Sequence, residues 1–178
     1  MSAEWGIWVF LFGDMAVFTA YFACIAGLRA QQPAMFKASQ QLLHPSLGVV
    51  NTVLLLTASL FVVRGVAAVR EQSSGARYFR LAMACAMGFA VIKCVEYTML
   101  VTEGHTLGSN SFFAYYYMFT AIHLTHLIAG AAVLLRIASI TRRAGLTVHQ
   151  KGFVECGACF WHLIDLLWLV LFPLLYFI

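Results

Sequence analysis

The last stretch of the chain, residues 154–178, places the strongest constraint on the fold. It is long enough to cross a bilayer, because a transmembrane helix needs about 20 mostly apolar residues. Its first half nevertheless carries three ionisable side chains, Glu155, His162 and Asp165. Ionisable groups within a membrane are costly, and they normally face other helices, a cavity or a partner. We therefore expect this helix to pack inside a bundle and not to lie alone in lipid.

The composition extends this conclusion to the whole chain. The 178 residues are 62% hydrophobic and only 10% charged, a balance typical of an integral membrane protein and not of a soluble globular domain. The first apolar run follows no basic segment, so we expect a retained helix and not a cleaved signal peptide. We predict one all-α domain, residues 1–178, built as a bundle of five transmembrane helices. The helices are predicted at about 5–28, 47–69, 81–101, 112–138 and 154–177.

Basic residues predict the orientation of this bundle in the membrane. They are concentrated in the loops after the second and fourth predicted helices, whereas the opposite side holds only Arg29 and Lys37. The first group is Arg70, Arg77, Arg80, Arg142, Arg143 and Lys151, with Arg64 and Arg136 near the adjoining helix ends. The positive-inside rule then predicts a cytoplasmic N-terminus and a periplasmic C-terminus. Arg142 and Arg143 are candidates for contact with lipid phosphates at the cytoplasmic face.

Three other spans also carry ionisable residues. Asp14 lies near the middle of the first span, at a rise of about 1.5 Å per residue. Lys93 and Glu96 are three residues apart, which places opposite charges on one helix face where they can pair. The fourth span carries His123 and His126.

We expect the intramembrane ionisable residues to form one buried polar network. Its predicted members are Asp14, Lys93, Glu96, His123, His126, Glu155, His162 and Asp165. Asp14 and Glu155 are the members best suited to exchange protons. Two interpretations of Asp14 remain open, a hydrogen bond between helices or a group that exchanges protons or contacts a lipid or partner.

The histidines raise the alternative of a metal or haem site. Imidazole is the commonest protein ligand of this kind, and His123, His126 and His162 are available. However, the chain lacks the larger ligand set that a di-metal site needs. We predict no metal in this chain and expect the histidines to bond across helices to Glu96, Glu155 or Asp165. The five cysteines all lie in predicted spans, where we expect packing and not a disulfide framework.

Taken together, these residues resemble subunit III of the haem–copper respiratory oxidases, over nearly the whole chain. The ending E-C-G-A-C-F-W-H-L-I-D-L-L-W is similar to the family's E-A-A-x-x-Y-W-H-F-V-D-x-x-W. The stretch F-T-A-I-H-L-T-H-L-I-A-G resembles its F-x-x-T-G-x-H-G-x-H-V-x-x-G. The Glu96-Tyr97 pair, the step from Gly108 to Phe113, and the segment from Leu47 to Leu60 also match family motifs in order.

The chain departs from the long members of this family in two respects. Those members have seven helices and this chain matches the last five, so the lipid-holding cleft built partly from the first two is not available within it. The first helix, W-G-I-W-V-F-L-F-G-D-M-A-V-F, has Asp14 where the oxidase subunits usually carry Glu. That form most resembles the short five-helix branch associated with nitric oxide reductase, the NorE-type proteins.

The resemblance implies a non-catalytic membrane subunit or accessory of a haem–copper oxidoreductase in a bacterial inner membrane. Haem and copper would reside in a catalytic subunit I, and this chain would stabilise that partner, bind phospholipid and support proton uptake. The partner would be an oxidase or a nitric oxide reductase. Two other classes stay open, a stand-alone intramembrane metal or haem protein and a small transporter. Nothing indicates a nucleic-acid partner.

Overall fold

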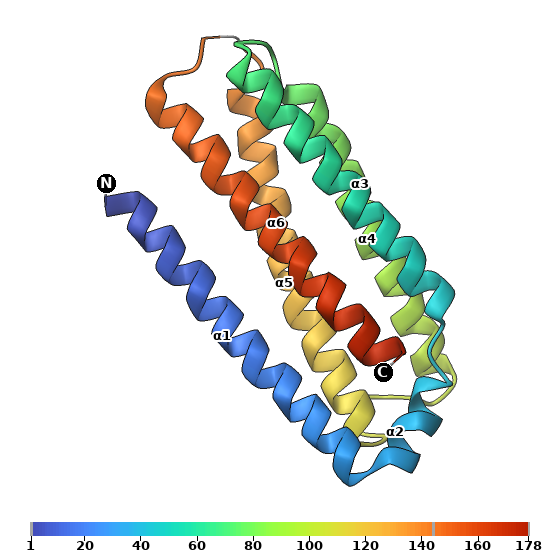
Figure 1. The fold of residues 1–178 in the computed structure, drawn as a ribbon. Coiled ribbons are helices and arrows are strands. Elements are labelled where there is room, and N and C mark those ends of the chain that lie inside the picture. Colours follow the sequence, from blue (N-terminus) through green and yellow to red (C-terminus); the bar gives the residue numbers. More distant parts are fainter. Residues whose placement is uncertain (1, 144, 178) are drawn as a thin grey trace.

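The computed structural model describes residues 2–143 and 145–177, with only the backbone described for 2–8, 10 and 11. This part of the chain folds into six helices: α1 Ser2–Gln31, α2 Pro33–Gln40, α3 Pro45–Arg70, α4 Ala76–Thr102, α5 Ser111–Ile140 and α6 Val148–Tyr176 (Figure 1). All but α2 are long and apolar enough to cross a membrane, α1 over Phe12–Gln31. The prediction of an all-α bundle with five spans is confirmed.

The long helices extend beyond the apolar runs that predicted them. The third predicted helix begins at Ala76 and not at 81, and the fifth begins at Val148 and not at 154. In α6 the added turn is closed by a capping box, in which Thr147 and Gln150 each bond the other's backbone N–H. Hydropathy locates the hydrocarbon layer, whereas the helix continues into the headgroup region with polar residues such as Arg77.

The short helix α2 lies between the first two predicted helices, where no helix was predicted (Figure 1). Pro33 occupies its first turn, where the missing N–H costs nothing. Phe36 and Ser39 are buried. Asn110 Nδ2 donates to Ser39 Oγ at 2.9 Å, and Gln40 Nε2 donates to the Leu175 carbonyl at 3.2 Å. These bonds fasten α2 across one end of the bundle, against α5 and α6.

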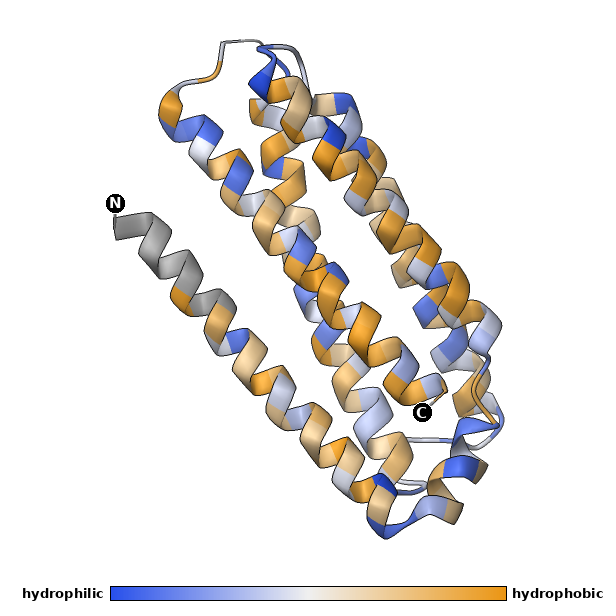
Figure 2. Cartoon of the chain, in the orientation of Figure 1, coloured by the Kyte–Doolittle hydropathy of each residue, from blue (hydrophilic) through white to orange (hydrophobic). Residues whose placement is uncertain are grey.

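The two ends of the bundle differ in which segments they hold. Figure 1 shows the start of α1 towards the same end of the bundle as the loops that join α3 to α4 and α5 to α6. The opposite end holds α2, the α4–α5 loop and the end of α6. Hydrophilic residues gather towards these ends, and most of each long helix is hydrophobic (Figure 2). The basic loops therefore share one end, and the orientation of that end towards the cytoplasm stays a prediction.

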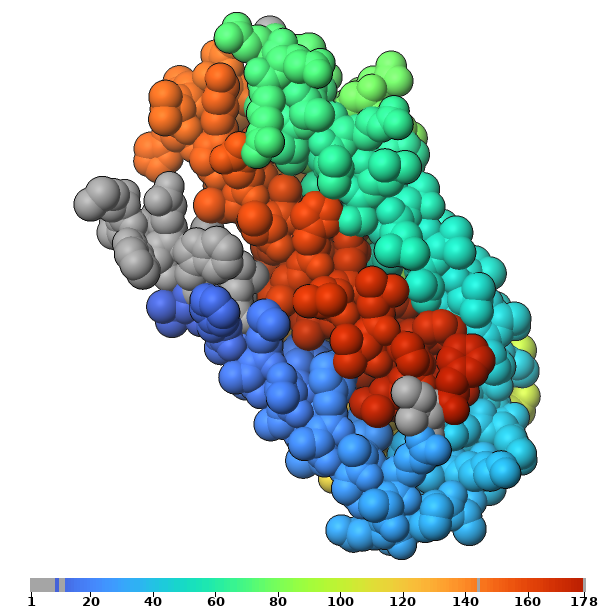
Figure 3. Space-filling view, in the orientation of Figure 1, coloured from blue at the N-terminus to red at the C-terminus, as the bar shows by residue number. Residues whose placement is uncertain are grey.

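The last helix is the central element of the bundle, as its ionisable residues led us to expect. In the apolar segment of 18 residues that marks α6 as a span, 56% of the residues are buried, against 11% in the corresponding segment of α1. α6 contacts α1, α3 and α5. Trp161, Ile164, Trp168 and Leu171 are fully buried. In contrast, α1 lies on one side of the other helices, against α6 on the side of the bundle shown in Figure 3.

Two glycines allow α5 and α6 to approach closely. A Cβ at Gly130 of α5 would lie 2.6 Å from Ile164 Cδ1, and one at Gly157 of α6 would lie 2.6 Å from Ile137 Cδ1. Small residues are the usual means of close helix contact in membranes, where packing replaces the hydrophobic effect. The α5–α6 interface therefore depends on these two missing side chains.

We predict that Gly130→Ala lowers the stability of the chain in mixed micelles by about 1–3 kcal/mol, because the added methyl overpacks the interface. Denaturant titration followed by circular dichroism measures this change. Gly152→Ala is the matched control, since a Cβ there meets nothing within 4 Å. Equal stability of the two variants would contradict close packing at Gly130.

Candidate functional site: polar contacts between the helices

The most deeply buried charges are on α4. Lys93 and Glu96 are 1% and 0% exposed, and Lys93 Nζ lies 2.8 Å from Glu96 Oε2, which confirms the predicted pair. The ammonium also donates to the hydroxyls of Tyr116 and Tyr176, at 3.0 and 2.9 Å. The Tyr176 hydroxyl in turn donates to the other carboxylate oxygen of Glu96. All three ammonium protons are thus used, and one cluster joins α4, α5 and α6.

Aromatic rings enclose the same ammonium. The rings of Tyr97, Tyr116, Trp168 and Tyr176 have centroids 4.8 to 5.7 Å from Lys93 Nζ. The negative faces of such rings attract a cation, most strongly where water is excluded. Tyr97 directly follows Glu96 in the sequence, whereas the other three rings were not predicted. They lie on α5 and α6, and no spacing rule relates them to α4.

Asp14 of α1 meets His126 of α5. Asp14 Oδ1 lies 3.1 Å from His126 Nε2, and His126 Nδ1 lies 2.8 Å from the Ile122 carbonyl. A carbonyl only accepts, so Nδ1 carries the proton of the contact with Ile122. The contact between Asp14 Oδ1 and His126 Nε2 then contains one proton, shared by the carboxyl and the imidazole. The two side chains are only 12% and 19% exposed. The pair therefore joins α1 to the bundle.

His162 and Asp165 of α6 lie near Ser59 of α3. Ser59 Oγ is 2.7 Å from His162 Nδ1, and Asp165 Oδ2 is 3.7 Å from the same nitrogen. A hydrolytic triad needs the serine and the carboxylate on opposite ring nitrogens. Here both face Nδ1, so the arrangement joins α3 to α6 and does not activate the serine. Ser59 was not among the predicted residues.

Two members of the predicted network lie elsewhere. Glu155 is 52% exposed and accepts from Arg70 Nη2 of α3 at 3.0 Å, so its expected burial is wrong. His162, seven residues further along α6, is also partly exposed, at 39% of its side chain. His123 is fully buried between Phe89 and Trp168, with ring centroids 5.7 and 5.3 Å away. Within the described part of the chain its ring nitrogens have no hydrogen-bond partner, contrary to expectation.

The eight residues therefore do not form one network. They divide into the Lys93–Glu96 cluster, the Asp14–His126 pair, the His162–Asp165 contact, the surface pair of Glu155, and His123 among aromatic rings. Among the residues that the structure describes, no three His, Cys, Asp or Glu side chains are grouped to hold a metal ion. The three histidines are in three different contacts, so the geometry gives the metal-site alternative no support.

Arg142 and Arg143 lie in the loop between α5 and α6, and both are exposed. Neither forms an ion pair or hydrogen bond with another described residue. Their predicted contact with lipid phosphates stays a prediction.

We predict that Lys93→Met destabilises the folded chain by about 3–5 kcal/mol, because it leaves the Glu96 carboxylate buried without a cation. Adding Glu96→Gln should recover part of this loss, since the remaining group is then neutral. Unfolding in mixed micelles measures both. Arg70→Ala is the control, because an exposed pair contributes only about 0–1 kcal/mol. A Lys93→Met effect as small as the control would contradict the assigned role.

Similarity to known proteins extends over nearly the whole chain. The family model described as cytochrome c oxidase subunit III matches residues 2–178. The chain is 26% identical over 173 residues to cytochrome bo(3) ubiquinol oxidase subunit 3 of Buchnera aphidicola, covering 96% of this chain and 84% of that protein. It is 28% identical over 174 residues to cytochrome c oxidase subunit 3 of Synechocystis, with 96% and 73% covered. The same subunit of Corynebacterium diphtheriae is 28% identical over 177 residues, with 97% and 86% covered.

Proposed function

Since the chain belongs to the cytochrome c oxidase subunit III family, whose members are non-catalytic subunits of haem–copper oxidases, we propose that it binds and stabilises a catalytic subunit I. The observation that carries this proposal is the family match over residues 2–178. The chain is a multi-pass protein of the bacterial inner membrane. In this proposal its N-terminus is cytoplasmic, and the haem and copper of the complex reside in subunit I.

The contacts within the chain support a stabilising role. The buried ionisable pairs join helices of this chain to one another: Lys93 to Tyr116 and Tyr176, and Asp14 to His126. The outer faces are apolar, with Val53 and Leu60 of α3 and Val91 of α4 more than half exposed. Such faces suit lipid tails or the apolar helices of a membrane partner. The chain thus offers an apolar surface on which a larger subunit and its lipids can pack.

The similar proteins favour an oxidase as the complex. The relatives described above are named as subunits of cytochrome c oxidase or ubiquinol oxidase. The alternative of a nitric oxide reductase accessory rests on the residues around Asp14, on the loop 39–42 and on the run 51–60, and none of these relatives is named for that complex. We therefore propose an oxygen-reducing partner.

We predict that the tagged chain, purified in mild detergent, brings down a larger haem-bearing subunit. Optical spectra detect its haem, and mass spectrometry identifies it. Oxygen and nitric oxide consumption by the isolated complex then separate the two branches. Recovery of this chain alone, together with normal oxidase assembly in a deletion strain, would refute the proposal.

A second prediction concerns proton uptake through the Asp14–His126 pair. Asparagine preserves a hydrogen bond to His126 but cannot ionise, so Asp14→Asn should leave assembly unchanged and slow sustained oxygen consumption. Asp14→Ala should also loosen α1, at a cost of about 0.6–1.7 kcal/mol. Thr19→Val is the control, because that hydroxyl bonds only to its own helix, at the Met15 carbonyl. If Asp14→Asn sustains oxygen consumption at the wild-type rate, the Asp14–His126 pair is only a contact between helices and has no role in proton uptake.

A further inference from the structure

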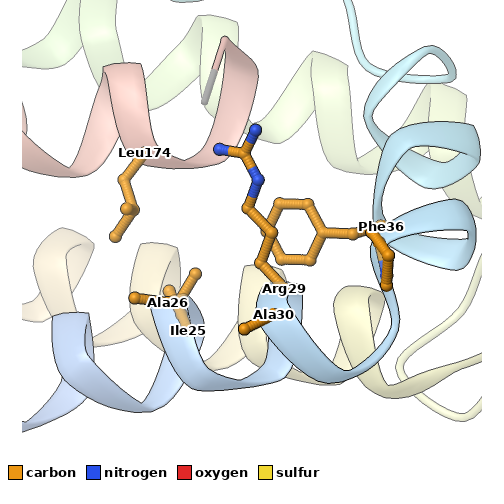
Figure 4. Close-up of a pocket in the computed structure, with 7 residues that line it drawn as sticks. Ile25, Ala26, Arg29, Ala30, Phe36 and Leu174 are labelled. Carbon is orange, nitrogen blue, oxygen red and sulfur yellow. The ribbon is translucent and has the colours of Figure 1, made fainter.

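A pocket of about 410 Å³ lies where three helices meet at one end of the bundle. The last two turns of α1 form one wall, the start of α2 a second, and the end of α6 a third (Figure 4). Its lining residues are Ile25, Ala26, Arg29, Ala30, Pro33, Phe36 and Leu174. The volume lies within the range of small-molecule sites, about 300–1,000 Å³.

The walls of this pocket are held in place by contacts outside it. Ile25 and Phe36 are 1% and 2% exposed. The Phe36 ring packs edge to face on Phe112, with centroids 4.8 Å apart. The hydrogen bond from Gln40 to the Leu175 carbonyl fastens α2 to α6 beside Leu174. The pocket is therefore formed before any ligand binds.

Arg29 is the one charged residue of the lining. Figure 4 shows its guanidinium extending from α1 towards the α6 side of the pocket. Arg70 and Lys93 bond to Glu155 and Glu96, but no carboxylate or other acceptor among the described residues bonds to Arg29. With respect to the described residues its donors are therefore available to a ligand, and a guanidinium binds phosphate oxygens with two parallel hydrogen bonds.

The order of groups along α1 defines the ligand further. Arg29 lies in the last turn of α1, at the level where a membrane helix reaches the headgroups. Ile25 and Ala26 lie one turn deeper, and Leu174 reaches towards them from α6 (Figure 4). A molecule that fits has an anionic head at the membrane surface and a hydrocarbon part directed inwards.

We propose that this pocket binds an anionic phospholipid, with its phosphate on Arg29 and the start of an acyl chain against Ile25, Ala26 and Leu174. A free phosphate would use the cation but not the apolar walls, and an uncharged lipid would use only the walls. The site lies at the opposite end of the bundle from Arg142 and Arg143. The inference rests on the proposed function in one respect only, that the chain binds lipids of its own membrane.

The test uses the full-length chain, delipidated in detergent and titrated with phosphatidylglycerol, with bound lipid counted by native mass spectrometry. We expect Arg29→Ala to weaken binding at one site by tenfold or more, because a charge-assisted contact is lost. Arg29→Lys should retain part of the affinity. Ala26→Phe should also weaken binding, because it fills the pocket while keeping the charge.

Lys37→Ala is the matched control, since this exposed cation of α2 lies at the same end but does not line the pocket. Wild-type affinity in both Arg29→Ala and Ala26→Phe would overturn the proposal, and so would an equal loss in Lys37→Ala. Inorganic phosphate that binds as tightly as the lipid would identify a free-anion site instead.

Recovery of subunit I with tagged Arg29→Ala separates this inference from the proposed function. We expect normal recovery together with reduced lipid. If Arg29→Ala no longer recovers subunit I but binds as much lipid as the wild type, the pocket contacts a protein, and the lipid site is refuted. Lipid binding that follows the expected pattern in a chain that never recovers subunit I would support this site and refute the partner.

Discussion

The structure depends on the requirement that each buried charge be satisfied from within the protein. A bilayer core offers no donor or acceptor, so the Lys93 ammonium and the Glu96 carboxylate must find theirs on neighbouring helices. They pair with each other, and tyrosines of α5 and α6 complete the set. This arrangement limits how α4, α5 and α6 can be rotated about their axes. The contacts of Gly130 with Ile164 and of Trp168 with Phe89 are compatible with that one rotation.

The same requirement acts more weakly on α1. This helix is joined to the bundle by the Asp14–His126 contact and by Phe18, which packs on Leu163 and Leu167 of α6. Little of α1 is otherwise buried. A helix held at its middle and tied to α2 at its end can leave space beside α6. The pocket around Arg29 occupies that end, where α1 turns into α2.

A bundle of this kind suits a subunit that supports chemistry carried out by a neighbour. Its ionisable side chains within the spans mainly bond to other helices of the same chain, and its histidines are not gathered at one point. Ser59, His162 and Asp165 show why residue types alone are a poor guide to catalysis. They are the residues of a hydrolytic triad, yet the serine and the carboxylate face the same ring nitrogen.

Sequence alone determined the five spans, because transfer into lipid depends on the length and composition of each segment. It also determined the Lys93–Glu96 pair, since a three-residue spacing relates side chains within one helix. Contacts between helices were decided only by the tertiary structure. The partner of Asp14 proved to be His126, Glu155 paired with Arg70 near the surface, and the aromatic cage came from two other helices. The physical reason is rotation: the periodicity of a helix shows which residues share a face, but packing against its neighbours decides where that face points.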